Sequence, residues 1–227
     1  MLKKFMKRIS ELFYATEKVY DKILQTDIVG KSEKMLKKLI LCEYRVWLKG
    51  FSFKGDILAG KRSALGEGNA SDYIIKRGDV VILDLLPGTN EICSDITRTF
   101  FTDEPTDNQR EVYDIVKTAL LSTEKQLRLG IEACEIYEFM SECLKPYEKT
   151  FFHHAGHRIG KKRLLMPQFL PNKRTKLKAG DIVTLEPGIY FKDDFGIRIE
   201  NDYLITQNGY ERLFNYPLDL EKFIIRK

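Results

Sequence analysis

The sequence lacks the features that mark membrane, secreted and zinc-finger proteins. None of its apolar runs reaches the length of a membrane span, so we expect a soluble protein. The basic start, MLKKFMKRISELFYA, has neither an unbroken apolar stretch nor a small-residue cleavage site, which favours a mature helix over a signal peptide. The four cysteines have no zinc-finger spacing, and we interpret them as reduced thiols of a cytoplasmic protein: Cys42, Cys93, Cys134 and Cys143.

Linkers and a strong excess of one charge are also absent. No Gly/Ser-rich segment divides the 227 residues, which suffice for one large domain or two small ones. Apolar residues make up 43% of the chain, enough for a core. The net charge of +5 permits acidic partners without requiring them. The composition therefore indicates a globular protein whose chemistry depends on particular residues.

Helices and hairpins alternate along the chain. Apolar residues three or four apart, together with capping and helix-ending residues, predict helices at 4–25, 32–49, 106–127 and 133–144. Thr106 and Gln109 form the capping box of the third helix. Strand pairs are expected at 79–101 and, later, at 181–191 and 197–206, and residues 150–180 are expected to be irregular and basic.

This order of elements repeats. The segments RGDVVILDL (residues 77–85) and AGDIVTLEP (residues 179–187) align after a shift of 102 residues, and the same shift aligns the two pairs of helices. Agreement at one offset predicts two related halves, about 1–102 and 103–227, in a single domain. Each half would be helix–helix–hairpin, and the halves would face each other across one sheet in an α+β fold.

The first hairpin carries two acids where burial costs most. Antiparallel pairing around the turn PGTN brings Asp84 opposite Asp95, or nearly so. Like charges in that arrangement are destabilising, and a buried carboxylate needs a partner. A shared proton, a nearby basic side chain or a metal ion would each relieve the repulsion.

The second hairpin repeats the arrangement with Glu186 and Glu200, whose midpoint, Asp193, lies in the turn KDDFG. If the halves face each other, four carboxylates converge. Arg98 and Arg198 offer only two positive charges against them, so coordination of divalent cations by oxygen ligands fits better. Two cations sharing bridging carboxylates would neutralise all four acids.

The chain has only three histidines, and His153, His154 and His157 all fall within FFHHAGHRIG. A lone histidine is more often structural, but this clustering favours chemistry. An imidazole beside four carboxylates suits manganese, cobalt, iron or zinc better than calcium or magnesium.

Four segments resemble the metal-site motifs of the pita-bread metallopeptidases: ILDLLPGTNEICSDITRTFF, HHAGHRIG, LKAGDIVTLEPGIY and GIRIEN. That family includes methionine aminopeptidases, Xaa-Pro aminopeptidases and prolidases, and SDITRTF, LEPGIY and RIE are closer to the Xaa-Pro and prolidase branch. The resemblance covers roughly residues 50–215. It implies the pita-bread fold, one catalytic domain and two divalent metal ions, manganese or cobalt first and zinc or iron as alternatives.

The resemblance also implies five metal ligands. Asp84 would bind one ion, His157 and Glu186 the other, and Asp95 and Glu200 would bridge both. A metal-bridging hydroxide would attack the N-terminal peptide bond, expected to be Xaa-Pro, and Glu186 would carry the proton. The implied activity is that of an aminopeptidase P or a prolidase acting on peptides with a free N-terminus.

The other two histidines receive different interpretations. His153 matches a family histidine that lines the substrate site, and we expect it to stabilise the tetrahedral intermediate. His154 matches no family role and is interpreted as an ordinary neighbour.

Two departures from the family pattern support an alternative. Gly66 stands near the place of one further family histidine, and Leu164 and Leu165 replace a His-Glu pair. Because a donor to the developing oxyanion is worth about 10²–10³ in rate, such losses leave open a weakly active or inactive metal-binding protein that serves as a binding module.

Residues 149–180 contain nine Lys and Arg and no acid. We interpret them as a solvated loop that offsets the acidic cluster, with attraction of a substrate carboxylate as an alternative. The shortage of interleaved aromatic residues disfavours nucleic-acid binding. The sequence leaves open whether the protein forms a homodimer. The basic residues are Lys149, Arg158, Lys161, Lys162, Arg163, Lys173, Arg174, Lys176 and Lys178.

Overall fold

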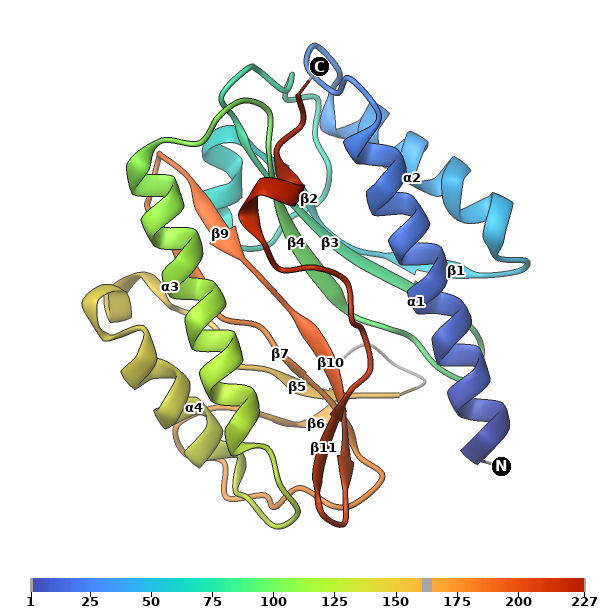
Figure 1. Cartoon of the computed structure of the whole chain (residues 1–227), viewed down its shortest axis with the longest axis vertical. Coiled ribbons are helices and arrows are strands. Elements are labelled where there is room, and N and C mark those ends of the chain that lie inside the picture. Colours follow the sequence, from blue (N-terminus) through green and yellow to red (C-terminus); the bar gives the residue numbers. More distant parts are fainter. Residues whose placement is uncertain (1, 161–164, 227) are drawn as a thin grey trace.

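In the computed structural model, which describes residues 2–160 and 165–226, two pairs of helices flank antiparallel strands (Figure 1). Helices α1 (Leu2–Leu24) and α2 (Glu33–Trp47) lie on one side of the strands in this view, and α3 (Asp107–Thr123) and α4 (Ala133–Cys143) lie on the other. One hydrophobic cluster draws buried residues from both pairs and from the strands. No helix among the described residues combines the length and apolar character that a membrane crossing needs.

The four predicted helices are confirmed, and side-chain caps explain where two of them begin. Ser32 accepts a hydrogen bond from the Met35 N–H at 3.2 Å before α2. Thr106 and Gln109 form the predicted capping box of α3, each side chain accepting from the backbone N–H of the other. Helix α3 ends at Thr123, earlier than expected, because a short 3₁₀ turn follows it.

Among the residues that the structure describes, the strands form three antiparallel sheets. The first contains β1 (Ser52–Lys54), β3 (Val80–Gly88), β2 (Ile57–Ala59) and β4 (Ile96–Phe101). The second has the order β11 (Gly209–Arg212), β10 (Asn201–Thr206), β7 (Ile182–Leu185), β5 (His157–Ile159) and β6 (Leu165–Gln168). The third is the pair β8 (Gly188–Tyr190) and β9 (Gly196–Arg198).

The two halves meet where β4 lies beside β9 and β10 (Figure 1). The Glu200 N–H donates to the Thr97 carbonyl at 3.1 Å, and the Thr99 hydroxyl donates to the Arg198 carbonyl at 2.8 Å. We call this line of contacts the seam. It brings the ends of both hairpins together, as the sequence predicted, although the ladders form three sheets rather than one.

The repeat inferred from the sequence is also visible in the turns that lead into β3 and β7. The Lys76 N–H donates to Asp79 Oδ2 at 2.8 Å, and 102 residues later the Lys178 N–H donates to Asp181 Oδ2, also at 2.8 Å. The turns thus use equivalent atoms at equivalent positions, which confirms two pseudo-symmetric halves.

Two strand predictions were wrong. Residues 150–180 are not all irregular: β5 and β6 lie there, because β5 pairs with β7 through Arg158↔Val183 and Ile159↔Ile182. The last hairpin is interrupted at Glu186–Pro187 and again at Ile199–Glu200. Proline has no N–H to donate to a ladder, which accounts for the first break.

Candidate metal centre

The first hairpin places its acids on one face but not directly opposite each other. Asp84 pairs with Thr97, and Leu85 pairs with Ile96. In this register Asp95 lies two residues from Thr97 on the return strand, so the two acids are diagonal neighbours on the same face. Direct pairing of the two acids is therefore off by two residues, because the turn is centred one residue later than PGTN suggested: Gly88 still pairs with Cys93, and residues 89–92 form the loop.

The second hairpin matches its prediction. Leu185 pairs with Asn201 and Gly188 pairs with Arg198, and continuing this register through the break places Glu186 opposite Glu200. The turn contains Asp193, which has a positive φ of 64°.

Three of the predicted ligands form a compact buried group. Asp95, His157 and Glu200 each offer one ligand atom, and these atoms lie within 4.8 Å of one another. His157 Nε2 is 3.3 Å from Asp95 Oδ2 and 3.8 Å from Glu186 Oε1. Glu186 therefore borders the same group. Asp84 is linked to the site by the hydrogen bond that it accepts from Arg198.

The orientation of His157 puts two acceptors face to face. Its Nδ1 lies 3.2 Å from the Arg158 carbonyl, which can only accept, so Nδ1 carries the proton. In the neutral ring Nε2 then presents a lone pair to the Asp95 carboxylate. A proton or a cation is needed between these two atoms.

Glu200 adds a second indication of a bound cation. Its Oε2 accepts from the Thr97 hydroxyl at 2.8 Å, but its buried Oε1 has no hydrogen-bond partner within residues 2–160 and 165–226. Burial and the nearby Asp95 carboxylate raise the pKa of Glu200 well above its ordinary value. Imidazole and carboxylate donors of this kind suit manganese, cobalt, iron or zinc, so the residues present fit a divalent metal ion.

The two buried arginines have different roles. Arg198 donates to Asp84 Oδ2 at 3.0 Å, to the Tyr190 hydroxyl at 2.9 Å and to the Gly66 carbonyl. Arg98 turns away from the acids: it donates to backbone carbonyls and to the Asn201 side chain, and its guanidinium lies 5.2 Å from the Phe214 ring centroid. Only Arg198 neutralises a predicted ligand.

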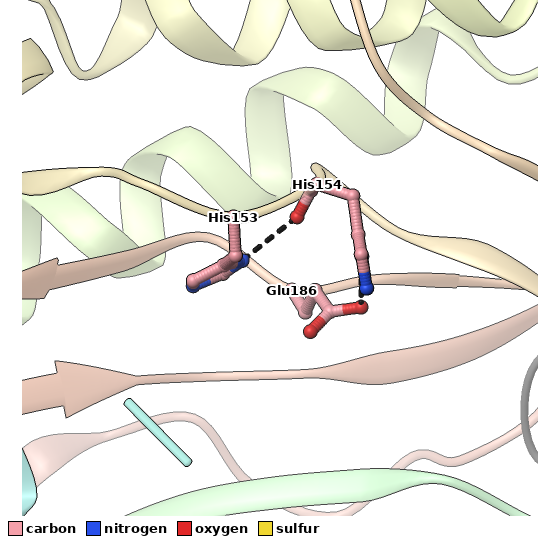
Figure 2. A group of neighbouring side chains, drawn as sticks. All are labelled: His153, His154 and Glu186. Atoms are coloured by element: carbon pink, nitrogen blue, oxygen red, sulfur yellow. Dashed lines mark hydrogen bonds and ion pairs between the residues drawn. The ribbon is translucent and has the colours of Figure 1, made fainter. Parts of the chain in front are cut away.

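His154 is not the ordinary neighbour that the sequence suggested. Its Nδ1 lies 3.1 Å from Glu186 Oε1, and Figure 2 shows its ring pointing to that carboxylate. Burial opposes ionisation of Glu186, but the adjacent histidines, His154 first, lower the pKa of this carboxyl below its ordinary value. The error arose because the segment is irregular here, so no strand or helix period indicates where each side chain points.

His153 lies beside Glu186 (Figure 2), and both of its ring nitrogens are engaged. Its Nδ1 donates to the His154 carbonyl at 2.8 Å, so its Nε2 accepts from the Tyr190 hydroxyl at 2.9 Å. Burial lowers the pKa of His153 to about 4, which makes it a neutral imidazole at pH 7. In this state Nε2 carries no proton, so the donor that the pair presents is the Tyr190 hydroxyl.

A cavity of about 420 Å³ leads to these groups. Asp84, His157 and Glu186 line it, whereas Asp95 and Glu200 are each only 1% exposed and lie deeper. The cavity is thus an access route to the buried donors.

Sequence reasoning missed three supporting residues. Thr97 bonds to Glu200, Tyr190 links His153 to Arg198, and Asp202 Oδ2 accepts from the Asp95 N–H at 3.1 Å. Burial raises the pKa of Asp202 well above its ordinary value, although the Asp95 N–H opposes the shift. Asp202 is visible in the sequence as the last residue of GIRIEND, but no sequence pattern indicated where its side chain points.

The sequence departs from the family pattern at Gly66 and at Leu164 and Leu165, and the structure describes the first and the last of these residues. Gly66 borders the cavity and its carbonyl accepts from Arg198. Leu164 lies outside the described residues with Lys161, Lys162 and Arg163, and Leu165 begins β6. In the basic segment, Arg158 pairs with Asp181 at 3.1 Å.

Comparisons of sequence point to one family. The family model described as metallopeptidase family M24 matches residues 2–207. The chain is 38% identical over 189 residues to the Xaa-Pro dipeptidase of Pyrococcus furiosus, covering 81% of this chain and 54% of that protein. It is 36% identical over 189 residues to the Xaa-Pro dipeptidase of Pyrococcus horikoshii, covering 81% and 53%. The chain therefore spans about half the length of these curated relatives.

Comparisons of structure point to the same fold. The chain superposes on the X-Pro aminopeptidase from Thermotoga maritima with a TM-score of 0.91 and 31% identity, covering 96% of this chain and 62% of that one. The prolidase from Pyrococcus horikoshii OT3 gives a TM-score of 0.90 and 32% identity, covering 96% and 63%. These similarities confirm the pita-bread fold expected from the sequence.

Proposed function

Because this chain belongs to metallopeptidase family M24, we propose that it is a dinuclear metal-dependent exopeptidase that hydrolyses the N-terminal bond of peptides, with Xaa-Pro as the preferred bond. The observation that carries this proposal is the buried group of Asp95, His157 and Glu200, in which an imidazole lone pair faces a carboxylate. That arrangement needs a proton or a cation between the two groups, and a divalent cation held there would serve a two-metal peptidase.

The proposed ligands are the five residues expected from the sequence. Divalent cations supply Lewis acidity in such a site: they polarise a carbonyl oxygen and lower the pKa of water. Manganese or cobalt is the proposed metal, with zinc or iron as alternatives, because the donors mix imidazole with carboxylate. The ligands are Asp84, Asp95, His157, Glu186 and Glu200.

Glu186 is the proposed proton carrier. It borders the cavity and lies against two imidazoles, with its Oε1 3.1 Å from His154 and 3.8 Å from His157. These neighbours keep the carboxylate ionised and therefore able to accept a proton from water and pass it to the leaving amine.

His153 is the proposed substrate-contacting histidine, acting with Tyr190. Their hydrogen bond places a hydroxyl and an imidazole at 2.9 Å beside the cavity, and Arg198 donates to the same hydroxyl. The neutral His153 would hold the Tyr190 hydroxyl beside the cavity, and that hydroxyl would be the donor to the developing oxyanion when its hydrogen bond to Nε2 is exchanged for one to the substrate.

We also propose the setting in which this activity occurs. Residues 1–227 would form one catalytic domain whose halves divide near residue 102, consistent with the shared hydrophobic cluster. The four cysteines are free, which agrees with the proposed cytoplasmic location. The partner would be a peptide with a free N-terminus, and a homodimer would be tested by measuring the mass in solution.

The decisive experiment is a peptidase assay on Xaa-Pro dipeptides and Xaa-Pro-Xaa tripeptides after loading with manganese, cobalt or zinc. We expect turnover that a chelator abolishes and that Glu186→Gln reduces by about 10²–10⁴-fold. Glu211→Gln, which changes an exposed acid on β11, is the matched control and should leave turnover unchanged.

The assay also separates the alternative function. Binding of two metal ions without turnover on any of these peptides would favour a binding module, the reading suggested by the replaced family histidines. Failure to bind manganese, cobalt or zinc at neutral pH would contradict both functions.

A further inference from the structure

Phe152 is an aromatic residue at the mouth of the cavity, and it is 60% exposed. The other described residues lining this cavity carry carboxylate, imidazole, amide or guanidinium groups, apart from Gly66. Phe152 is therefore the one apolar side chain among them. Leaving a phenyl ring in water forgoes the free energy of burying it, so the ring retains the capacity to bind an apolar group.

The ring occupies the space next to Gly66. A Cβ atom at residue 66 would lie 2.9 Å from Phe152 Cζ and 3.2 Å from its Cε2. Gly66 has a φ of 76°, which disfavours any other residue, and its carbonyl is held by Arg198. A side chain at residue 66 and the Phe152 ring therefore exclude each other.

Two neighbouring rings keep Phe152 in place. Its centroid lies 5.0 Å from that of Tyr190 in a tilted arrangement and 5.9 Å from that of His153, edge to face. Both neighbours belong to the hydrogen-bonded pair proposed to contact the substrate. The phenyl ring thus packs against the pair that is proposed to contact the substrate.

We infer that Phe152 is a specificity-determining residue that contacts an apolar side chain or ring adjoining the scissile bond. Beside Gly66, this chain offers an apolar wall rather than a polar donor. The inference rests on the proposed function, because it names the substrate class of the same site: peptides whose first or second residue is apolar.

The test compares peptides that differ on each side of the bond. kcat/KM is measured for Leu-Pro, Gly-Pro and Gly-Ala with the metal-loaded wild type, Phe152→Ala and Phe152→Leu. Leu129→Ala, which removes an exposed apolar side chain that does not line the cavity, is the control. Binding of the same peptides is measured by calorimetry in the Glu186→Gln background, which reports selectivity without turnover.

We expect the wild type to favour Leu-Pro over Gly-Pro by about tenfold or more, as apolar pockets discriminate by such factors. Phe152→Ala should reduce this ratio to below about threefold and Phe152→Leu should retain part of it. If the ring instead contacts the residue after the bond, Phe152→Ala will reduce the ratio of Gly-Pro to Gly-Ala.

The outcomes separate this inference from the proposed function. Turnover with both ratios unchanged in Phe152→Ala overturns the inference and leaves the peptidase intact. Selective binding that Phe152→Ala removes, without any hydrolysis, supports the inference and overturns the peptidase. Absence of peptide binding and turnover in every variant overturns both.

Discussion

The two hairpins that carry the acids keep their like charges apart in different ways, because their strands pair in different registers. In the first, Asp84 faces Thr97 and Asp95 lies diagonally along the return strand. In the second, Glu186 and Glu200 occupy directly opposite positions where both strands are interrupted. The first hairpin thus separates its like charges along the ladder, and the second leaves the ladder where its charges would meet.

Two of the acids, Asp84 and Glu200, have a hydrogen-bond partner across the seam rather than within their own hairpin. Thr97 of the first hairpin donates to Glu200 of the second, and Arg198 of the second donates to Asp84 of the first. Each hairpin therefore supplies the partner that the other lacks. The predictions below are ordered from the largest expected effect.

Glu200→Gln should affect the centre most. Removing this carboxylate should abolish binding of the second metal ion and lower kcat by at least about 10²-fold. In metal-free protein at neutral pH the substitution should instead be favourable for stability. The free energy of unfolding of the variant should be higher by about 1 kcal/mol, because a buried acid repelled by its neighbours has been removed. Calorimetric unfolding with and without metal measures how the substitution changes stability in each state. Equal changes in the metal-bound and metal-free states would contradict the explanation.

Arg198→Met tests the contact across the seam. Because Asp84 loses its guanidinium partner in a buried site, the free energy of unfolding should fall by about 3–5 kcal/mol, and the variant should bind less metal. Arg98→Met is the matched comparison, since Arg98 is also buried but contacts Glu200 only through its backbone carbonyl and no acid through its carboxylate. Denaturant unfolding and metal analysis should show destabilisation in both variants and reduced metal affinity only in Arg198→Met.

His154→Ala distinguishes the two neighbouring histidines. Because His154 contacts Glu186, its loss should weaken metal affinity by about 10–100-fold. His153→Ala should raise KM and lower kcat but change metal affinity by less than about threefold, since His153 bonds to Tyr190 and a carbonyl. Titration with cobalt, followed by absorbance, measures the affinities, and equal losses in both variants would contradict these assignments.

The equivalent turns before β3 and β7 should give the smallest effect. Asp181 pairs with Arg158, whereas Asp79 accepts from the Tyr73 hydroxyl at 3.1 Å. Asp181→Asn should cost about 1 kcal/mol of unfolding free energy, and Asp79→Asn should cost less.

The Asp79 variant should also change the pH dependence of stability. Burial raises the pKa of Asp79 despite hydrogen bonds from Lys76 and Tyr73, so the folded state binds this proton more tightly than the unfolded state. Its contribution to stability is complete below the unfolded pKa of about 4 and is lost as pH rises through the raised value. Denaturation of the wild type and Asp79→Asn between pH 3 and 7 should show the variant gaining relative stability as pH increases.

Much of this molecule follows from local patterns in the sequence. Apolar spacing and the Thr106–Gln109 capping box determined the helices, because both act within a few residues along the chain. The repeat followed from residue types at one offset, and the turn around Asp193 placed Glu186 opposite Glu200. These features need no knowledge of distant contacts.

The tertiary structure decided the rest. The direction of His154, the strand β5 that carries His157, and the contact of Phe152 with Gly66 all depend on segments far apart in sequence. The register of the first hairpin likewise depended on a turn centred one residue later than its composition suggested. The sequence by itself determined which donors are present and on which hairpins they lie. Tertiary packing decided which donors meet, because burial leaves each charged group only the partners that packing brings to it: Arg198 and Thr97 across the seam for Asp84 and Glu200, and His154 within the same half for Glu186.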